Sequence, residues 1–423
     1  MWRNVATGPP PRLHLVSKLP AAIPPQSRRD EMGREMSRYD VVVVGARCAG
    51  AATAMLLAEL GHDVVMVDKA RLPSDTLSTH AIARGGVVQL ARWGLLDRIG
   101  APPVRKVVFD IEGNAITRPI KDRAGVDSLI APRRHLLDGV LADAAQQSGA
   151  GLVTGLKATG VLRSSEGRVT GITAHTSSGD RLELPARFVV GADGRQSRMA
   201  GFMGAETLEH FTPTCSTYYT YVAGLGSDSF EFHVAPGAYA GVFPTHDDLA
   251  CVWLIQPTDA LDPVRTAGSA RIPAFLQALE QLVPGLGRRV RAGRVTAPVR
   301  GAVELPNYLR RPYGPGWALV GDAGYHRDPI TGHGITDAFR DAELLATALD
   351  LSLRDPKVER AAMASYQDVR DAMLREVFDL TRALTAFPPM DRFVELQIQL
   401  SVALDREAEQ LAGFPGRNDL IAC

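Results

Sequence analysis

The stretch from Tyr39 to Ala70, YDVVVVGARCAGAATAMLLAELGHDVVMVDKA, constrains the fold of this chain more than any other segment. The β-branched run from Val41 to Val44 predicts a strand that is buried on both faces of a parallel sheet, and Gly45 ends it at a sharp turn. We expect a helix from about Ala49 and a second strand that ends at Asp68. This order of strand, turn, helix and strand predicts a dinucleotide-binding unit.

The small residues of this turn favour a close approach between the start of the helix and a pyrophosphate. Unpaired N–H groups and the positive end of the helix dipole would then face the phosphates. Asp68 follows Gly45 by about 23 residues, near the spacing of roughly 20 at which an acidic side chain reaches a ribose hydroxyl. The residues assigned to this part of the cofactor are Gly45, Ala46, Ala49, Gly50, Asp68 and Lys69.

One position departs from the usual G-x-G-x-x-G pattern, because Arg47 stands in place of the middle glycine. A side chain at this position limits how closely the backbone approaches a phosphate. The guanidinium either adds a charge-assisted contact or swings outward. An ordinary parallel strand and helix without a ligand is the alternative interpretation of the segment.

Two further motifs indicate a flavin. The segment from Phe188 to Arg198, FVVGADGRQSR, reads as an apolar strand with a glycine-rich end. The segment from Trp317 to Leu345, WALVGDAGYHRDPITGHGITDAFRDAELL, reads as a strand, a glycine-rich turn and a long helix. Together with the first segment, in this order and at these separations, they resemble the class A flavoprotein monooxygenase family, whose relatives include flavin-dependent halogenases and geranylgeranyl-reductase-type enzymes. The resemblance covers about residues 39 to 351.

The resemblance implies which residues contact FAD. In that family the first glycine-rich turn binds the FAD pyrophosphate. An Asp-Gly pair, matched here by Asp193 and Gly194, lies near the pyrophosphate and is linked to both FAD and NAD(P)H binding. A Gly-Asp pair, matched by Gly321 and Asp322, holds the ribityl and ribose region.

Two arginines precede a predicted amphipathic helix, HLLDGVLADAAQQSG, with Leu137 and Leu141 on its inner face. In the family an arginine three residues before the first apolar helix position meets FAD. Arg134 fits that register, and Arg133 stays open. The alternative interpretation is that both arginines are solvated side chains at the start of a helix. A positive charge at that position is mildly unfavourable unless an anion binds there.

The last motif brings further candidate groups close to the flavin. Asp322 should lie at the carboxyl end of a strand, where ligands of open α/β sheets bind. Backbone N–H groups at the next helix start would point at the flavin pyrimidine edge and favour the reduced anion. The residues assigned there are Gly332, Gly334 and Ile335, and the near-flavin candidates for catalysis are His80, Pro329 and His333, with His326 also close to the motif. The alternative is a helix-capping aspartate, glycines of a surface turn and hydrogen-bonded scaffold histidines.

The resemblance implies a flavin monooxygenase. FAD would be reduced by NAD(P)H as a transient co-substrate and react with O2 to a flavin hydroperoxide, which transfers one oxygen to an aromatic or polyketide-like small molecule. We find no second G-x-G-x-x-G for a separate nicotinamide domain. The alternatives are a geranylgeranyl-type alkene reductase, a halogenase and a non-catalytic flavin-binding protein. The segment Val252 to Pro257, VWLIQP, lacks the first tryptophan of the halogenase pattern W-x-W-x-I-P.

The expected fold class is α/β, with a FAD-binding Rossmann-like domain of the glutathione-reductase type, an interleaved antiparallel β-sheet substrate domain and a helical C-terminus. The FAD-binding domain is assigned to 37–103, 121–213 and 300–350, the substrate domain to 104–120 and 214–299, and the helical region to 351–423. Residues 1–36, rich in proline and arginine, predict a disordered or non-native leader. Aromatic candidates for the substrate pocket are Tyr218, Tyr219, Tyr221, Phe232, Phe243 and Trp253.

Charge and cysteine content exclude other classes. Lys plus Arg and Asp plus Glu number 47 each, which gives no electrostatic case for nucleic acid. The four cysteines form no C-x-x-C pair, so neither a metal site nor a redox disulfide is indicated, and a reducing cytoplasm is expected. No apolar run of about 18 residues predicts a membrane span. The 423 residues can bury a large core, as a monomer or homodimer.

Overall fold

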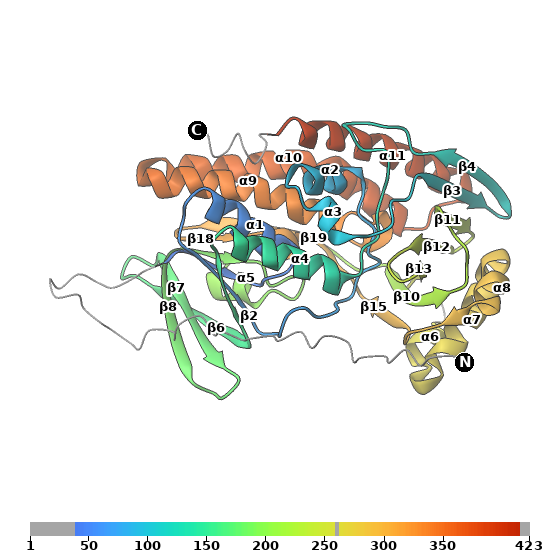
Figure 1. Ribbon diagram of the computed structural model, residues 1–423, viewed down its shortest axis with the longest axis horizontal. Helices are drawn as coiled ribbons and strands as arrows, with labels where there is room; N and C mark the ends of the chain where they lie inside the picture. Colours follow the sequence, from blue (N-terminus) through green and yellow to red (C-terminus); the bar gives the residue numbers. More distant parts are fainter. Residues whose placement is uncertain (1–38, 259–261, 415–423) are drawn as a thin grey trace, which may run out of the picture. The chain divides into compact units, whose positions relative to one another are not determined.

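The computed structural model describes residues 39–258 and 262–414. The predicted leader, 1–36, and the end of the predicted helical region, 415–423, lie outside these ranges. The described chain has the predicted α/β fold, with two large sheets and helices layered on them (Figure 1).

The first large sheet contains the dinucleotide unit. Its strands run in the order β17-β18-β8-β1-β2-β5, and all neighbours from β18 to β5 are parallel. The bounds are β1 (Tyr39–Val44), β2 (Val64–Asp68), β5 (Gly151–Thr154), β8 (Arg181–Gly191), β17 (Tyr313–Gly314) and β18 (Trp317–Leu319). An antiparallel hairpin of β6 (Leu156–Arg163) and β7 (Val169–Thr176) continues from β8. The valines of β1 are buried on both faces, as their β-branched run predicts.

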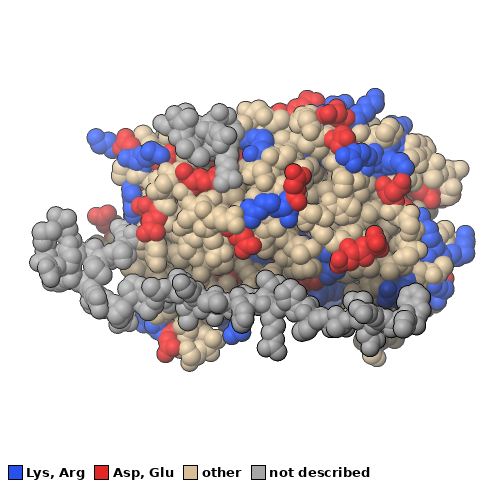
Figure 2. Space-filling model, viewed as in Figure 1, with Lys and Arg blue, Asp and Glu red and all other residues tan. Residues whose placement is uncertain are grey.

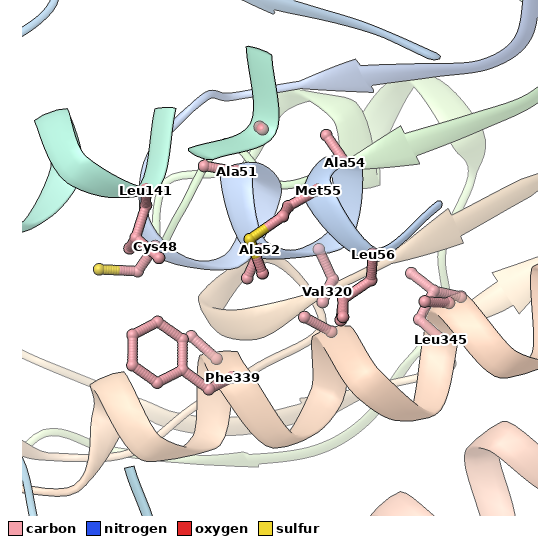
Figure 3. Packing of buried hydrophobic residues seen from close by; sticks show 14 of the residues in the cluster. Cys48, Ala51, Ala52, Ala54, Met55, Leu56, Leu141, Val320, Phe339 and Leu345 are labelled. Carbon is pink, nitrogen blue, oxygen red and sulfur yellow. The ribbon is translucent and has the colours of Figure 1, made fainter. Parts of the chain in front are cut away.

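Three helices cover one face of this sheet: α1 (Cys48–Glu59), α4 (Arg134–Gln147) and α9 (Gly334–Arg354). The alanines of α1 allow close packing of neighbouring helices. Figure 3 shows Ala52, Met55 and Leu56 of α1 directed toward Phe339 and Leu345 of α9, with Leu141 of α4 beside Cys48. This packing fixes the starts of α1 and α9 against the carboxyl ends of the strands.

Shorter elements connect the sheet to the site. Helices α2 (Arg84–Arg92) and α3 (Leu96–Ile99) follow β2, and α5 (Arg198–Met203) follows β8. The 3-10 turns η2 (Gly321–Ala323) and η3 (Pro329–Thr331) precede α9, and η4 (Pro356–Val358) follows it. A small sheet joins β9 (Thr207–Phe211), β16 (Asn307–Arg310) and β19 (Tyr325–His326).

The second large sheet is the predicted substrate sheet. Its order is β14-β10-β13-β12-β11-β3-β4, and β15 also pairs with β10. The bounds are β3 (Lys106–Ile111), β4 (Asn114–Pro119), β10 (Cys215–Ala223), β11 (Phe230–Ala235), β12 (Ala238–Pro244), β13 (Leu249–Pro257), β14 (Arg294–Val295) and β15 (Arg300–Val303). All pairs in this sheet are antiparallel except β3 with β11, which is parallel. Since β15 belongs to this sheet, the sheet extends past the expected boundary at 299.

Different helices cover the two faces of the substrate sheet. The 3-10 turn η1 (Gly268–Ala270) and α6 (Pro263–Thr266) lead into α7 (Arg271–Leu282) and α8 (Pro284–Ala292), which pack against the face that carries Tyr218 and Val222. Helices α10 (Glu359–Thr385) and α11 (Met390–Ala412) pack against the opposite face, which carries Tyr219 and Trp253. Helix α11 also packs against α2, so the C-terminal helices contact both halves of the described chain.

The charges of the surface are mixed. Figure 2 shows Lys and Arg side chains interspersed with Asp and Glu side chains on the face in view, in keeping with the zero net charge. None of the helices in the described ranges combines the length and the apolar character that crossing a bilayer requires.

Candidate cofactor and active site

A cavity of about 740 Å³ lies where the carboxyl ends of β1, β2, β8 and β18 meet the substrate sheet. Residues from all three sequence motifs line it, together with Thr217 and Tyr219 of β10 and Ala302 of β15. Parallel strands of open α/β sheets bind their ligands at this edge. The fold therefore gathers segments that are far apart in the sequence around one space.

The first glycine-rich turn forms one end of the cavity. Gly45 and Ala49 line the wall, whereas Gly50 lies behind it. A Cβ on Gly50 would lie 1.8 Å from the Gly45 carbonyl oxygen, so only glycine allows α1 to approach the strand this closely. Gly45 itself has φ +107°, which side chains rarely adopt. The start of α1 therefore presents its free N–H groups to the cavity.

Asp68 and Lys69 line the same end of the cavity. The Asp68 carboxylate accepts the backbone N–H groups of Ala46, at 3.0 Å, and Ala70, at 2.8 Å. Ala46 is fully buried and contributes to the site through this hydrogen bond rather than through the wall. Asp68 thus braces the turn, and each oxygen keeps a lone pair for a ribose hydroxyl.

The structure separates the two arginines at the start of α4. Arg134 lines the cavity and pairs with the fully buried Asp138 at 2.9 Å. Arg133 pairs instead with Asp75 at 3.1 Å, and its guanidinium lies 3.9 Å from the centre of the Tyr221 ring. Of the two, Arg134 is the one that lines the cavity.

Asp193 and Gly194 also line the cavity. The Asp193 carboxylate accepts the Ser197 hydroxyl at 2.5 Å and the backbone N–H groups of Arg198 and Met199 at 2.8 and 3.1 Å. These hydrogen bonds order the turn before α5. Through these contacts the Asp193 carboxylate fixes the shape of this part of the cavity wall.

The third motif forms the other end of the cavity, whose lining residues are Asp322, His326, Pro329, Gly332, His333, Gly334 and Ile335. Gly321 lies behind them with φ +58°, where a Cβ would come within 2.9 Å of the Ala49 side chain. The Tyr308 hydroxyl donates to the Asp322 carbonyl at 2.6 Å and holds this turn in place. The N-terminus of the long helix α9 follows directly.

A buried ionic network lies beneath this end, and the sequence patterns gave no signal for it. Glu407, on α11, accepts from His333 at 2.5 Å and from Arg340 at 2.7 Å. Arg340 also donates to Asp337 at 2.9 Å, and Arg327 donates to the same carboxylate. His333, Asp337 and Glu407 have the spacing of a metal site, but both carboxylates already bind guanidinium groups. Detecting the Glu407 contact requires the tertiary fold, because it joins residues 74 positions apart.

His80 lies beside the cavity between two wall residues, Thr79 and Ala81. Its backbone has φ +70°, which is uncommon for a residue with a side chain and is often found at functional sites. Its Nε2 bonds with the Tyr221 hydroxyl. Burial, and after it the charges of Arg134 and Arg133, lowers the pKa of His80 to about 3. The imidazole is therefore neutral at neutral pH.

The cavity is positively charged although the chain is neutral overall. Its basic lining residues are Arg47, Lys69, Arg134, Lys157, Arg195, Arg198 and Arg327, and its acidic ones are Asp68, Asp193, Asp322 and Asp328. FAD carries a pyrophosphate and, when reduced, an anionic ring. The glycine turn at Gly45 and Gly50, the two helix N-termini and the excess of basic side chains suit both of these groups. The residues present therefore fit this cofactor.

Comparisons with known proteins agree with this site. The model of the FAD binding domain family matches residues 38–277. A digeranylgeranylglycerophospholipid reductase of Methanocella arvoryzae is 28% identical over 80% of this chain and 84% of its own length. In fold, the chain is similar to the flavin-dependent brominase Bmp2, with a TM-score of 0.74 and 18% identity over 88% of this chain and 94% of the other. It is also similar to PqsL of Pseudomonas aeruginosa in complex with 2-aminobenzoylacetate, with a TM-score of 0.73 and 21% identity over 86% and 100%. The chain belongs to the FAD binding domain family and is an FAD-dependent oxidoreductase.

Proposed function

We propose that this protein is an NAD(P)H-driven monooxygenase that hydroxylates a compact organic molecule, aromatic or polyketide-like. The observation that carries the proposal is the dense packing of the substrate sheet beside the cavity. Rings of Phe230 and Phe243 lie 4.4 Å apart, and the Tyr239 ring lies 5.0 Å from Trp253 and 5.4 Å from Phe393 of α11. These side chains fill the face between the sheet and α11, and none of them lines the cavity. The space left for a substrate is therefore the part of the cavity beside Thr217, Tyr219 and Ala302, which suits a compact molecule better than a long chain.

We assign the cofactor contacts along the cavity. The start of α1 binds the pyrophosphate, Asp68 the adenosine ribose, and Asp322 the ribityl chain. The backbone N–H groups of Gly334 and Ile335 would hold the pyrimidine edge of the ring, where the dipole of α9 would favour negative charge. When bound, FAD supplies the redox chemistry between NAD(P)H, O2 and the substrate.

His80 is the proposed positioning group for the substrate. In the neutral tautomer whose Nε2 accepts from the Tyr221 hydroxyl, the proton lies on Nδ1. That buried nitrogen has no hydrogen-bond partner among the described residues. A neutral imidazole N–H is a good donor to a carbonyl or phenolic oxygen. We therefore assign Nδ1 to an oxygen of the substrate or the flavin.

A second candidate function is alkene reduction, and the reductase from Methanocella arvoryzae favours it. Such a reaction needs the same FAD and NAD(P)H but no O2. Halogenation has less support, because the tryptophan of the VWLIQP segment, Trp253, packs into the aromatic core against Phe243 at 5.3 Å. The two main candidates differ in the substrate and in the need for oxygen.

The test is reduction of the yellow protein by NADPH without oxygen, with aromatic and isoprenoid compounds added in turn. Loss of the oxidised flavin absorbance gives the reduction rate, and mass spectrometry gives the product before and after oxygen is admitted. Faster reduction with an aromatic compound and a product 16 mass units heavier after oxygen supports hydroxylation. A product two mass units heavier that forms without oxygen refutes hydroxylation and establishes alkene reduction.

A further inference from the structure

Arg47, which replaces the middle glycine of the first motif, lies at the N-cap of α1 and lines the cavity. Its backbone is extended, with φ −102° and ψ −163°, a conformation that any residue adopts. The backbone at this position therefore does not require glycine, and the role of Arg47 depends on the contacts of its side chain.

The side chain of Arg47 is held on two sides. Its Nη2 donates to the Ser74 hydroxyl at 2.9 Å, and its Nη1 lies 3.6 Å from the Asp138 carboxylate. The second distance is too long for a hydrogen bond, and this buried Nη1 has no hydrogen-bond partner among the described residues. A buried donor of a charged group without an acceptor is costly. Because the Arg47 side chain lies on the cavity wall and is 27% exposed, a rotation of the guanidinium would bring this N–H to an anion of the ligand.

Asp138 organises the charges at this end of the cavity. It is fully buried on α4, where it accepts Arg134 Nη2 at 2.9 Å and the Cys48 thiol at 3.2 Å. One carboxylate thus faces two guanidinium groups next to the free N–H groups at the start of α1, with Asp322 as a further acidic neighbour of Arg134. Guanidinium groups and free helix N–H groups are donors that suit a pyrophosphate.

We infer that Arg47 and Arg134 form a two-arginine clamp on the FAD pyrophosphate, oriented by Asp138, and that this clamp takes over the role of the missing glycine. In the usual motif the glycine lets the backbone approach the phosphate. In this chain a guanidinium N–H reaches the phosphate in place of that close backbone approach. The inference rests on FAD binding alone, so it holds for oxygenation and for alkene reduction alike.

The experiment measures the affinity of the apoprotein for three ligands: FAD and ADP, which carry the pyrophosphate, and riboflavin, which does not. Arg47→Ala should weaken FAD and ADP by about 10- to 100-fold, the effect of a lost charge-assisted hydrogen bond, and leave riboflavin unchanged. Arg47→Lys keeps the charge but loses the fork, so an intermediate loss is expected. Arg118→Ala, on the exposed strand β4, is the matched control for a lost arginine.

Two variants separate the clamp from other roles of Arg47. Arg47→Gly restores the usual motif, and it should bind FAD more weakly than the wild type. Ser74→Ala removes the contact to the neighbouring loop and leaves the guanidinium in place, so its affinity should stay within about threefold of the wild type. Equal or tighter FAD binding by Arg47→Gly, an equal loss for riboflavin, or a full loss in Ser74→Ala would overturn the clamp. Circular dichroism of each apoprotein verifies that the variant is folded. If Arg47→Ala and Arg47→Gly do not fold, the affinities of Arg47→Lys for the three ligands provide the test.

Discussion

Asp328→Asn should stabilise the protein, and only above acidic pH. Asp328 is 1% exposed and lines the cavity at the same end as Pro329 and His333. Its Oδ1 accepts the Ile330 N–H at 3.0 Å, while its Oδ2 has no partner among the described residues. Burial raises the pKa of Asp328 to about 7 from a usual value of 3.8. The amide keeps the shape and the Oδ1 contact and removes the charge.

The magnitude and the sign follow from linkage. Between about pH 4 and pH 7 the unfolded chain has lost this proton and the folded chain has kept it, so the folded state loses stability as the pH rises. A difference of about 3 pKa units corresponds to about 4 kcal/mol at pH 8, as an upper value. The asparagine variant does not carry this cost. We therefore expect a gain of about 2 to 4 kcal/mol at pH 8 and almost none at pH 4.

The assay is urea unfolding of the wild type and Asp328→Asn at pH values from 4 to 8, followed by tryptophan fluorescence. A gain that is the same at pH 4 and pH 8 would refute the ionisation argument, and so would a loss of stability at pH 8. Reduction by NADPH is measured in parallel. If the carboxyl serves the reaction, the variant is more stable but slower, which is the usual exchange at functional sites.

Three further substitutions test other parts of the site. Gly50→Ala places a Cβ 1.8 Å from the carbonyl oxygen of Gly45, so FAD occupancy and melting temperature should both fall, by about 1 to 3 kcal/mol in stability. Asp322→Ala should release FAD without unfolding, and full cofactor content in the purified variant contradicts the ribityl assignment. Glu407→Ala should cost about 3 kcal/mol at pH 7, because it leaves buried His333 without its partner. Burial raises the pKa of Glu407, but the contact with His333 lowers it by more than burial raises it. The net pKa therefore lies below the usual value of a glutamate. This contribution is therefore present above about pH 4.5 and lost as the pH falls, and the gap in urea unfolding between wild type and variant should close in acid.

Local sequence patterns predicted the elements that carry the cofactor, because each pattern has a local physical cause. The valine run, Gly45 and the small residues of α1 specify a buried strand, a left-handed turn and a close helix without reference to the rest of the chain. The strand, turn and helix around Asp322 follow the same logic, and α9 begins at Gly334, one residue before the expected start.

Patterns of period two predicted the strands of the substrate sheet but not which face meets the cavity. Tyr218 and Tyr219 are neighbours in β10, so they point to opposite faces. Tyr219 lines the cavity, whereas Tyr218 bonds with Asp262 on the far face, beneath α7 and α8. An alternating pattern is unchanged when its two faces are exchanged, and only the helices that cover each face decide between them.

The two halves of the chain contribute different parts of the site. The groups that fit FAD come from the β1-α1 turn and the η2 to α9 segment, and they do not depend on what the substrate is. The space beside the flavin depends instead on Tyr219, on the aromatic face of the substrate sheet and on α11, which supplies Phe393 to that face. Because α11 also supplies Glu407 to the cofactor end, a shift of this helix would change the substrate space and the contacts of His333 together. The C-terminal helices therefore contact both the aromatic face of the substrate sheet and the network beneath the cofactor end, so substitutions in α11 are expected to change both together.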